Sequence, residues 1–201
     1  PSRFIELDGK QLTVRVSDTS GGGVRTRELG PILAGFNENF QSEYRYDDTT
    51  HADVTAFTVQ IAEVAVDLET GEITILNILS AHDSGRVINP QGYEGQIRCG
   101  VSQGIGYALL EEIEMDQGRV ISGSLADYRI PTIADLSGIH PLVIESDSGV
   151  GPYGIKGIGE NPLSPVAPAI ANAIADATGV RIRSLPITAE RLLKELKKSG
   201  R

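Results

Sequence analysis

The chain has 201 residues, of which 40% are hydrophobic and 22% are charged, an ordinary balance for a globular protein of one domain or two small α+β lobes. Its formal net charge of -9 argues against a nucleic-acid partner. No apolar run reaches about 18 residues and no signal-peptide pattern opens the chain, so we expect no membrane span and a cytoplasmic protein. Cys99 is the only cysteine, and the chain alone cannot build a disulfide framework, an iron–sulfur cluster or a cysteine zinc site.

The first fifty residues predict a hairpin followed by irregular structure. Residues 4–7 and 11–16 alternate around Asp8-Gly9, a typical hairpin signal. Residues 17–27 are polar and rich in glycine, so we interpret them as a loop, and residues 37–50 as an irregular connection. The chain opens at Pro1 in a strand-like pattern without a Met, and we therefore expect a piece of a longer protein.

The strongest hairpin signal lies at residues 54–80. Residues 54–66 alternate, with the even-numbered positions on one face, and residues 72–80 return after a turn at 68–71. The second strand ends in a polar cluster that contains His82, Asp83 and Arg86. This cluster is either part of a site at the strand end or a hydrogen-bonded corner in which Asp83 pairs with Arg86. It lacks the ligand spacing of a metal site.

Residues 91–112 predict a long helix whose apolar residues recur at spacings of three and four. Gly100, Gly104 and Gly106 are unusual inside a helix, since each costs about 0.5–1 kcal/mol relative to Ala. Either close packing or close approach of a ligand offsets that cost, with Ser102 and Gln103 among the available polar groups. Beyond this helix we expect a hairpin at 113–120, strands at 140–146 and 181–185, and a helix at 188–196 with Thr188 as its N-cap.

The segment 151–179 organises the rest of the chain. It places four glycines and Lys156 immediately before Glu160, and a proline-punctuated, alanine-rich helix follows. The positive end of that helix and Lys156 would both favour the charged form of Glu160, the form that a general base needs. The alternative is a tight strand-to-helix turn in which Glu160 merely caps the helix. The pattern is neither a P-loop nor the G-x-G-x-x-G of a dinucleotide fold.

Five blocks of the sequence together point to a family. They resemble, in this order, the C-terminal part of the molybdenum-binding subunit of the xanthine dehydrogenase/aldehyde oxidase family. The resemblance covers residues 4–196, and the G-x-K-G-x-G-E block is its most specific part. The blocks are HDSGRVINP (82–90), GQIRCGVSQGIGYALLEE (95–112), DYRIP (127–131), GIKGIGE (154–160) and ATGVRIRSLPIT (177–188).

The resemblance implies a fold and a set of site residues. The fold would be α+β, a mixed or antiparallel sheet with packed helices, in a second molybdenum-cofactor-binding domain that spans residues 1–201. Glu160 matches the catalytic glutamate, which acts as general base, and Gln103 matches a glutamine that hydrogen-bonds the pterin. Gly100 and Ser102 would lie along the same cofactor surface, and Lys156 and Gly159 flank the base. No protein ligand to the metal is expected.

The resemblance also implies cofactors and partners. The cofactor would be molybdopterin with molybdenum, in the cytosine dinucleotide form, whereas iron–sulfur clusters and FAD would lie only on partner chains. The N-terminal half of the molybdenum subunit is missing here, so the chain alone should be inactive, and an uncovered half-site could make it a homo-oligomer. The small-molecule substrate would be an aldehyde, a purine or an N-heterocycle.

One departure from the family pattern leaves a second interpretation open. Arg98-Cys99-Gly100 stands where many relatives have Glu-Gly-Gly, which puts a bulky charge and a thiol beside the expected cofactor surface. Together with the missing half, this departure is the basis for a rival hypothesis. In that hypothesis the chain is a non-catalytic interaction or assembly module that retains the fold.

Overall fold

The computed structural model describes residues 3–8, 13–18, 23–28, 54–136 and 138–200. The chain divides into two units, Pro1–Tyr46 and Asp47–Arg201. The first unit contains an antiparallel sheet of strands β1 (Arg3–Asp8), β2 (Thr13–Asp18) and β3 (Gly23–Glu28), in the order β1-β2-β3.

The sheet of the first unit confirms one prediction and overturns another. The expected hairpin is present as β1 and β2. The loop expected at residues 17–27 is wrong, because β2 continues to Asp18 and residues 23–28 pair with it as β3. The glycine run suggested a loop, but strand formation depends on the available partner more than on local composition. The irregular connection predicted at 37–50 lies outside the described residues.

The second unit is built on a mixed sheet of strands β4 (Phe57–Val66), β5 (Ile73–Asp83) and β8 (Ile139–Ile144), in the order β4-β5-β8. Strands β4 and β5 form the predicted antiparallel hairpin, with a bulge at Glu63/Val64. Strand β8 pairs with β5 in parallel. Because a parallel pair needs a long crossover, helix α2 (Pro90–Leu109) lies in the connection between them.

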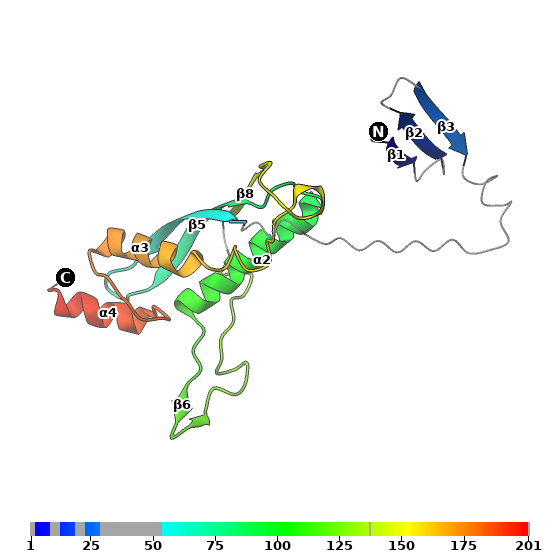
Figure 1. The fold of residues 1–201 in the computed structure, drawn as a ribbon. Coiled ribbons are helices and arrows are strands. Elements are labelled where there is room, and N and C mark those ends of the chain that lie inside the picture. Colours follow the sequence, from blue (N-terminus) through cyan, green and yellow to red (C-terminus); the bar gives the residue numbers. More distant parts are fainter. Residues whose placement is uncertain (1–2, 9–12, 19–22, 29–53, 137, 201) are drawn as a thin grey trace. The chain divides into compact units, whose positions relative to one another are not determined.

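Three helices cover one face of this sheet: α2, α3 (Val166–Thr178) and α4 (Ala189–Lys198) (Figure 1). The even-numbered residues of β4 are half-buried beneath them, as the alternation predicted. The apolar stripe expected on α2 is likewise buried. The buried core consists of Ile75, Ile78, Tyr93, Ile97, Val101, Ile105, Ala108, Val166, Ile170, Ile174, Ile187, Leu192 and Leu196. The α+β fold class predicted from the sequence is confirmed.

The opposite face of the sheet carries large apolar side chains that no described residue buries. Register places them in adjacent rows, since Val59 faces Ala81 and Ala81 faces Leu142. A polar edge borders the rows, where Asn77 donates to Glu63 at 2.7 Å and bonds the His140 ring at 3.0 Å. An apolar layer of this kind normally packs on another layer. Its large exposed members are Phe57, Val59, Ile61, Leu79, Leu142 and Ile144.

Two glycines of α2, Gly100 and Gly104, are explained by its close packing on α3 and on the turn before it. A Cβ on Gly100 would lie 2.6 Å from Cβ of Pro162, and one on Gly104 would lie 2.4 Å from Cβ of Val166. Both distances are shorter than any real contact of a Cβ atom allows. Close packing therefore offsets the helix cost of these glycines, and the neighbour is α3 with its preceding turn.

The remaining elements mostly follow the predictions. Strands β6 (Met115–Asp116) and β7 (Arg119–Val120) form the expected hairpin, whose turn residues Gln117 and Gly118 have φ of 46° and 83°. This hairpin extends away from the helices and the sheet of its unit (Figure 1). Among the described residues, no helix combines the length and apolarity that a membrane span requires.

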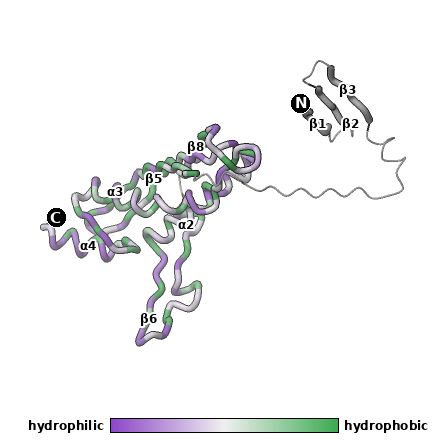
Figure 2. The backbone as a smooth tube through the Cα atoms, viewed as in Figure 1, coloured by the Kyte–Doolittle hydropathy of each residue, from purple (hydrophilic) through white to green (hydrophobic). Residues whose placement is uncertain are grey.

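The C-terminal segment corrects one prediction. Thr188 caps α4 as expected, accepting from the Arg191 amide at 3.2 Å. The strand predicted at 181–185 is wrong, because that segment is irregular and Ile182 packs on the core without a neighbouring strand. Figure 2 shows α4 as mostly hydrophilic, and its leucines Leu192 and Leu196 reach the core.

We predict that Gly104→Ala lowers the free energy of unfolding by roughly 1–3 kcal/mol, the usual range for overpacking, because the new methyl group would collide with Val166. Gly95→Ala on the same helix is the matched control, since its Cβ would meet nothing within 4 Å. That control should gain up to about 1 kcal/mol from helix propensity. Urea unfolding of both variants measures the difference, and equal stabilities would contradict the packing account.

Candidate functional site

Glu160 lies in a loop between the short 3-10 helix η1 (Pro152–Gly154) and α3, and its side chain is exposed. A turn begins at Glu160, where the Leu163 amide donates to its carbonyl at 3.0 Å. The loop borders a hollow of about 920 Å³. The hollow brings Glu160 together with two other predicted site residues, Lys156 and Gly159. Its lining consists of Val54, Thr55, Ala56, Val150, Gly151, Ile155, Lys156, Gly157, Gly159, Glu160 and Asn161.

Lys156 turns its ammonium group into the protein. Its Nζ atom lies 2.9 Å from Oδ2 of Asp83 and 3.0 Å from the carbonyl of Thr55, and the side chain is 3% exposed. Asp83 thus pairs with Lys156, whereas the corner interpretation had paired it with Arg86. The charge of Lys156 is neutralised within the chain. The lysine therefore ties the loop to the end of β5 and the chain before β4.

Three donors hold the Asp83 carboxylate. The Ser146 hydroxyl donates to Oδ1 at 2.6 Å, Lys156 donates to Oδ2, and the Gly85 amide donates to Oδ1 at 3.1 Å. Because all three favour the charged form, with Ser146 contributing most, they lower the pKa of Asp83 from its ordinary 3.8 to about 2. The polar cluster that the sequence placed at the end of β5 therefore fixes the position of Lys156 and its loop.

The glycines of the loop differ in what they require. Gly149 and Gly151 are closely surrounded. A Cβ on Gly149 would lie 1.9 Å from the Gly154 carbonyl oxygen, and one on Gly151 would lie 2.7 Å from the Ile155 side chain. A Cβ on Gly157 or Gly159 would instead meet nothing within 4 Å. Neither of these two has the positive φ that favours glycine. Contacts among the described residues thus do not explain Gly157 and Gly159, and their backbone is open to close approach from outside.

The predicted residues of α2 lie beside this loop in two different environments. Gly100 is buried against Pro162 and the Leu163 amide. Ser102 is half-buried and donates to the carbonyl of Arg98 at 2.7 Å. Gln103 is exposed one turn further along the helix, and its Nε2 atom lies 3.1 Å from the Tyr107 hydroxyl. Gln103 does not line the Glu160 hollow, so the structure brings the two residues to neighbouring elements without joining them in one cavity.

The Arg98-Cys99 pair, which departs from the family pattern, points in two directions. Arg98 donates from Nη1 to the carbonyl of Ile139 at 2.9 Å and so ties α2 to the start of β8. Cys99 is exposed on the same side of α2 as Gln103, one turn earlier. The Arg98 guanidinium thereby bonds the sheet, whereas the Cys99 thiol lies on the exposed face of the helix.

A buried polar chain beneath the loop was missed in the sequence. His82 is 1% exposed, and its ring bonds Ser80 Oγ at 2.6 Å and Thr58 Oγ1 at 3.1 Å. Burial lowers the pKa of His82, so the ring is neutral near pH 7. Gln60 connects this chain to the carbonyl of Pro162 at 2.7 Å. The sequence analysis had named His82 only as part of a polar cluster at the strand end, and alternating polar residues on the covered face of β4 were the further signal. No group of three potential metal-binding side chains gathers among the described residues.

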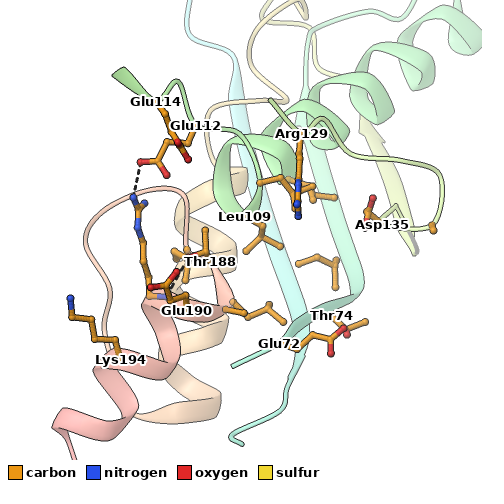
Figure 3. A pocket seen from close by; sticks show the side chains of 18 residues that line it. Glu72, Thr74, Leu109, Glu112, Glu114, Arg129, Asp135, Thr188, Glu190 and Lys194 are labelled. Carbon is orange, nitrogen blue, oxygen red and sulfur yellow. Dashed lines mark hydrogen bonds and ion pairs between the residues drawn. The ribbon is translucent and has the colours of Figure 1, made fainter. Parts of the chain in front are cut away.

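A second hollow, of about 1010 Å³, lies between the start of β5, the end of α2 and the start of α4 (Figure 3). Charged side chains of both signs line it, and Arg191 pairs with Glu112 at 2.6 Å. It is the larger of the two hollows, yet it contains none of the predicted site residues. Size alone therefore does not identify the candidate site, and the loop of Glu160 remains the candidate.

The sequence matches the molybdopterin cofactor-binding domain family over residues 13–137. A putative xanthine dehydrogenase molybdenum-binding subunit of Escherichia coli (strain K12) is 42% identical over 147 residues, which cover 72% of this chain and 20% of that protein. The structure of quinoline 2-oxidoreductase from Pseudomonas putida 86 aligns with a TM-score of 0.64 and 37% identity, over 67% of this chain and 18% of its own. CO dehydrogenase from Oligotropha carboxidovorans aligns with a TM-score of 0.67 and 29% identity, over 72% and 18%.

This chain belongs to the molybdopterin cofactor-binding domain family, in the form found in the molybdenum subunits of xanthine dehydrogenases and aldehyde oxidoreductases. The family resemblance seen in the sequence is thus confirmed. The chain spans about one fifth of the length of the curated relatives it matches. The roles predicted for Glu160, Gln103, Gly100, Ser102, Lys156 and Gly159 stay predictions.

We predict that Asp83 makes the free energy of unfolding of this chain depend on pH in the acid range. Its pKa is lowered in the folded state, so its contribution is fully present above its ordinary pKa of 3.8 and is lost as the pH falls towards about 2. The difference in unfolding free energy between the native chain and Asp83→Asn should therefore be constant above about pH 4 and should shrink below it. Denaturant titrations at several pH values measure this difference. A difference independent of pH would rule out the carboxylate as its source.

Proposed function

We propose that this chain contributes the general base, Glu160, and part of the cofactor-binding surface of a molybdenum hydroxylase. The observation that carries this proposal is the position of Glu160. Its carboxylate is exposed at an open hollow, on a loop whose neighbours on both sides are tied to the sheet. A general base needs an accessible carboxylate that is held in place, and this loop supplies one.

The residues around Glu160 suit molybdopterin. The pterin presents ring N–H and carbonyl groups, which call for hydrogen-bond partners of both kinds. The side-chain amide of Gln103 and the open backbone of Gly159 offer them. Ser102 lies next to Gln103 on α2. In this proposal Lys156 and Gly100 support the cofactor-binding surface from inside the protein. Asp83 binds the Lys156 ammonium, and Pro162 covers Gly100.

The proposed reaction is hydroxylation of an aldehyde, a purine or an N-heterocycle. When bound, the molybdenum cofactor supplies the two-electron oxidation. Glu160 accepts a proton at its carboxylate from the oxygen nucleophile as that oxygen adds to an electrophilic carbon of the substrate. Relatives named for xanthine, quinoline and nicotinate support this range of substrates. Polypeptide outside this chain would select among them, since the chain spans at most a fifth of the length of those relatives.

The proposed partners follow from the small share of its relatives' length that this chain spans. The rest of a molybdenum subunit would complete the pocket, and iron–sulfur and flavin subunits would carry the electrons away. The cofactor would be the cytosine dinucleotide form. This chain alone would be inactive, and the assembled enzyme is the form to test.

We predict that Glu160→Gln in the complete enzyme lowers turnover by at least about 100-fold, the range for loss of a general base, while molybdenum content stays unchanged. Steady-state kinetics and metal analysis measure the two quantities. Glu190→Gln is the control, because Glu190 lines the second hollow instead (Figure 3). It should leave turnover near normal.

Near-normal turnover of the Glu160→Gln enzyme would remove the catalytic assignment. Independently of that result, an assembled complex that held no molybdenum or cytosine nucleotide would favour the rival hypothesis of a non-catalytic assembly module. A loss of turnover in both Glu160→Gln and Glu190→Gln would shift the search to the second hollow.

We predict that Gly159→Val weakens cofactor retention without destabilising the fold, because its side chain would enter space that no described residue fills. An overpacking cost of about 1–3 kcal/mol against the cofactor corresponds to ~10- to 100-fold weaker binding. Molybdenum content after dialysis and thermal unfolding measure the two effects. Gly123→Val is the matched control, since Gly123 is equally open but lies far along the chain from the loop. Full retention in Gly159→Val would contradict a cofactor contact at that glycine.

A further inference from the structure

The loop of Glu160 is held at two points, one on each side of the carboxylate. On the N-terminal side, Lys156 is bound by Asp83 and the Thr55 carbonyl. On the C-terminal side, the carbonyl of Pro162 accepts a hydrogen bond from Gln60 Nε2 at 2.7 Å. Between these points the Asn161 side chain donates to the Gly157 carbonyl at 3.2 Å and closes the loop on itself.

The contact from Gln60 has a defined direction. A proline carbonyl can only accept, so the Gln60 amide must present its nitrogen to Pro162. The same nitrogen donates to Ser80 Oγ at 2.8 Å. Ser80 Oγ also bonds His82 Nε2 at 2.6 Å, and His82 Nδ1 bonds Thr58 Oγ1 at 3.1 Å. A continuous polar chain therefore links Gln60 to Thr58 through Ser80 and His82.

This polar chain is rigid because it is buried. Ser80 and His82 are 0% and 1% exposed, and both lie on the central strand of the sheet. Gln60 extends from β4, the neighbouring strand, towards the loop. The amide is therefore held from behind by the sheet before it reaches Pro162.

Pro162 connects the hydrogen bond from Gln60 to the position of Glu160. Its ring lies against Gly100 of α2, its carbonyl is held by Gln60, and the turn that contains it closes between the Leu163 amide and the Glu160 carbonyl at 3.0 Å. Glu160 is the first residue of that turn. A displaced Pro162 carbonyl would move the start of the turn, and with it the carboxylate.

The two halves of the Gln60 amide differ in their contacts. Its Oε1 atom is buried and has no hydrogen-bond partner in the described part of the chain. A buried acceptor without a partner is destabilising. An apolar side chain of the same length would remove this unpartnered acceptor, and with it the two bonds that Nε2 donates. The Nε2 donor is thus the half of the Gln60 amide that makes hydrogen bonds.

We propose that Gln60 is a positioning residue for Glu160, which fixes the turn of the base through the Pro162 carbonyl. This inference rests on the proposed role of Glu160 as general base. It adds a second requirement for turnover, on a side chain that does not line the hollow.

The test is Gln60→Met in the complete enzyme, because methionine keeps the length and removes both the donor and the unsatisfied acceptor. We expect kcat to fall by about 10- to 100-fold, since a displacement of about 1 Å has such effects, while KM and molybdenum content stay within about twofold. Kinetics use whichever of xanthine, quinoline and benzaldehyde the native enzyme oxidises best. Thermal unfolding is measured alongside, because a merely structural role would lower stability while the folded enzyme kept its kcat.

A second readout does not depend on activity. Hydrogen exchange of the Leu163 amide, which bonds the Glu160 carbonyl, should become at least about tenfold faster in Gln60→Met. Glu63→Gln is the matched control, because Glu63 lies on the same strand but on the opposite face, where it bonds Asn77. It should change neither kcat nor exchange.

The outcomes separate this inference from the proposed function. If Glu160→Gln abolishes turnover but Gln60→Met changes neither kcat nor exchange, the positioning role is overturned and the function stands. Faster exchange with normal kcat would show that Gln60 holds the turn without positioning the base, which also overturns it. If Glu160→Gln keeps turnover, the function fails instead. Should Gln60→Met not fold, Ser80→Ala removes the support behind the amide, and it should give the same two effects at smaller size.

Discussion

The second unit depends on how closely α2 approaches the turn before α3. Gly100 and Gly104 permit that approach, since a side chain at either position would overlap Pro162 or Val166. With α2 and α3 in contact, the alternating residues of β4 and β5 have a layer to pack against, and one continuous core forms. The same contact places Pro162 beside β4, within hydrogen-bond distance of Gln60. Helix packing and the geometry of the candidate site therefore have one origin.

The electrostatics of the loop follow from a pair of opposite charges beneath it. A buried ammonium group such as that of Lys156 needs a partner, because leaving it unpaired away from water is costly. Asp83 supplies the partner, and its three donors keep it charged to low pH. The charge at the mouth of the hollow then comes from Glu160 and the surrounding backbone dipoles. The sequence predicted that the Lys156 charge would favour the charged form of Glu160, but Asp83 neutralises that charge instead.

The sheet has two unequal faces, and this bears on how the chain would work. Helices cover one face, while the other presents apolar rows on three strands that no described residue covers. A sheet with one face on a core and the other apolar and open is usually one layer of something larger. The chain spans a fifth of its relatives, and a site completed by other polypeptide is consistent with both facts.

The sequence by itself determined the family, the strongest hairpin and the three helices of the second unit. Those features depend on local periodicity and on an ordered set of motifs, which are properties of neighbouring residues. It did not predict β3, and it placed a strand at 181–185, because strand formation depends on a partner that only the folded chain supplies. Only the tertiary structure decided that Lys156 pairs with Asp83, 73 residues away, and that Gln60 holds Pro162, 102 residues away. Contacts at such separations follow from how α2 and α3 pack on the sheet, and no local pattern encodes them.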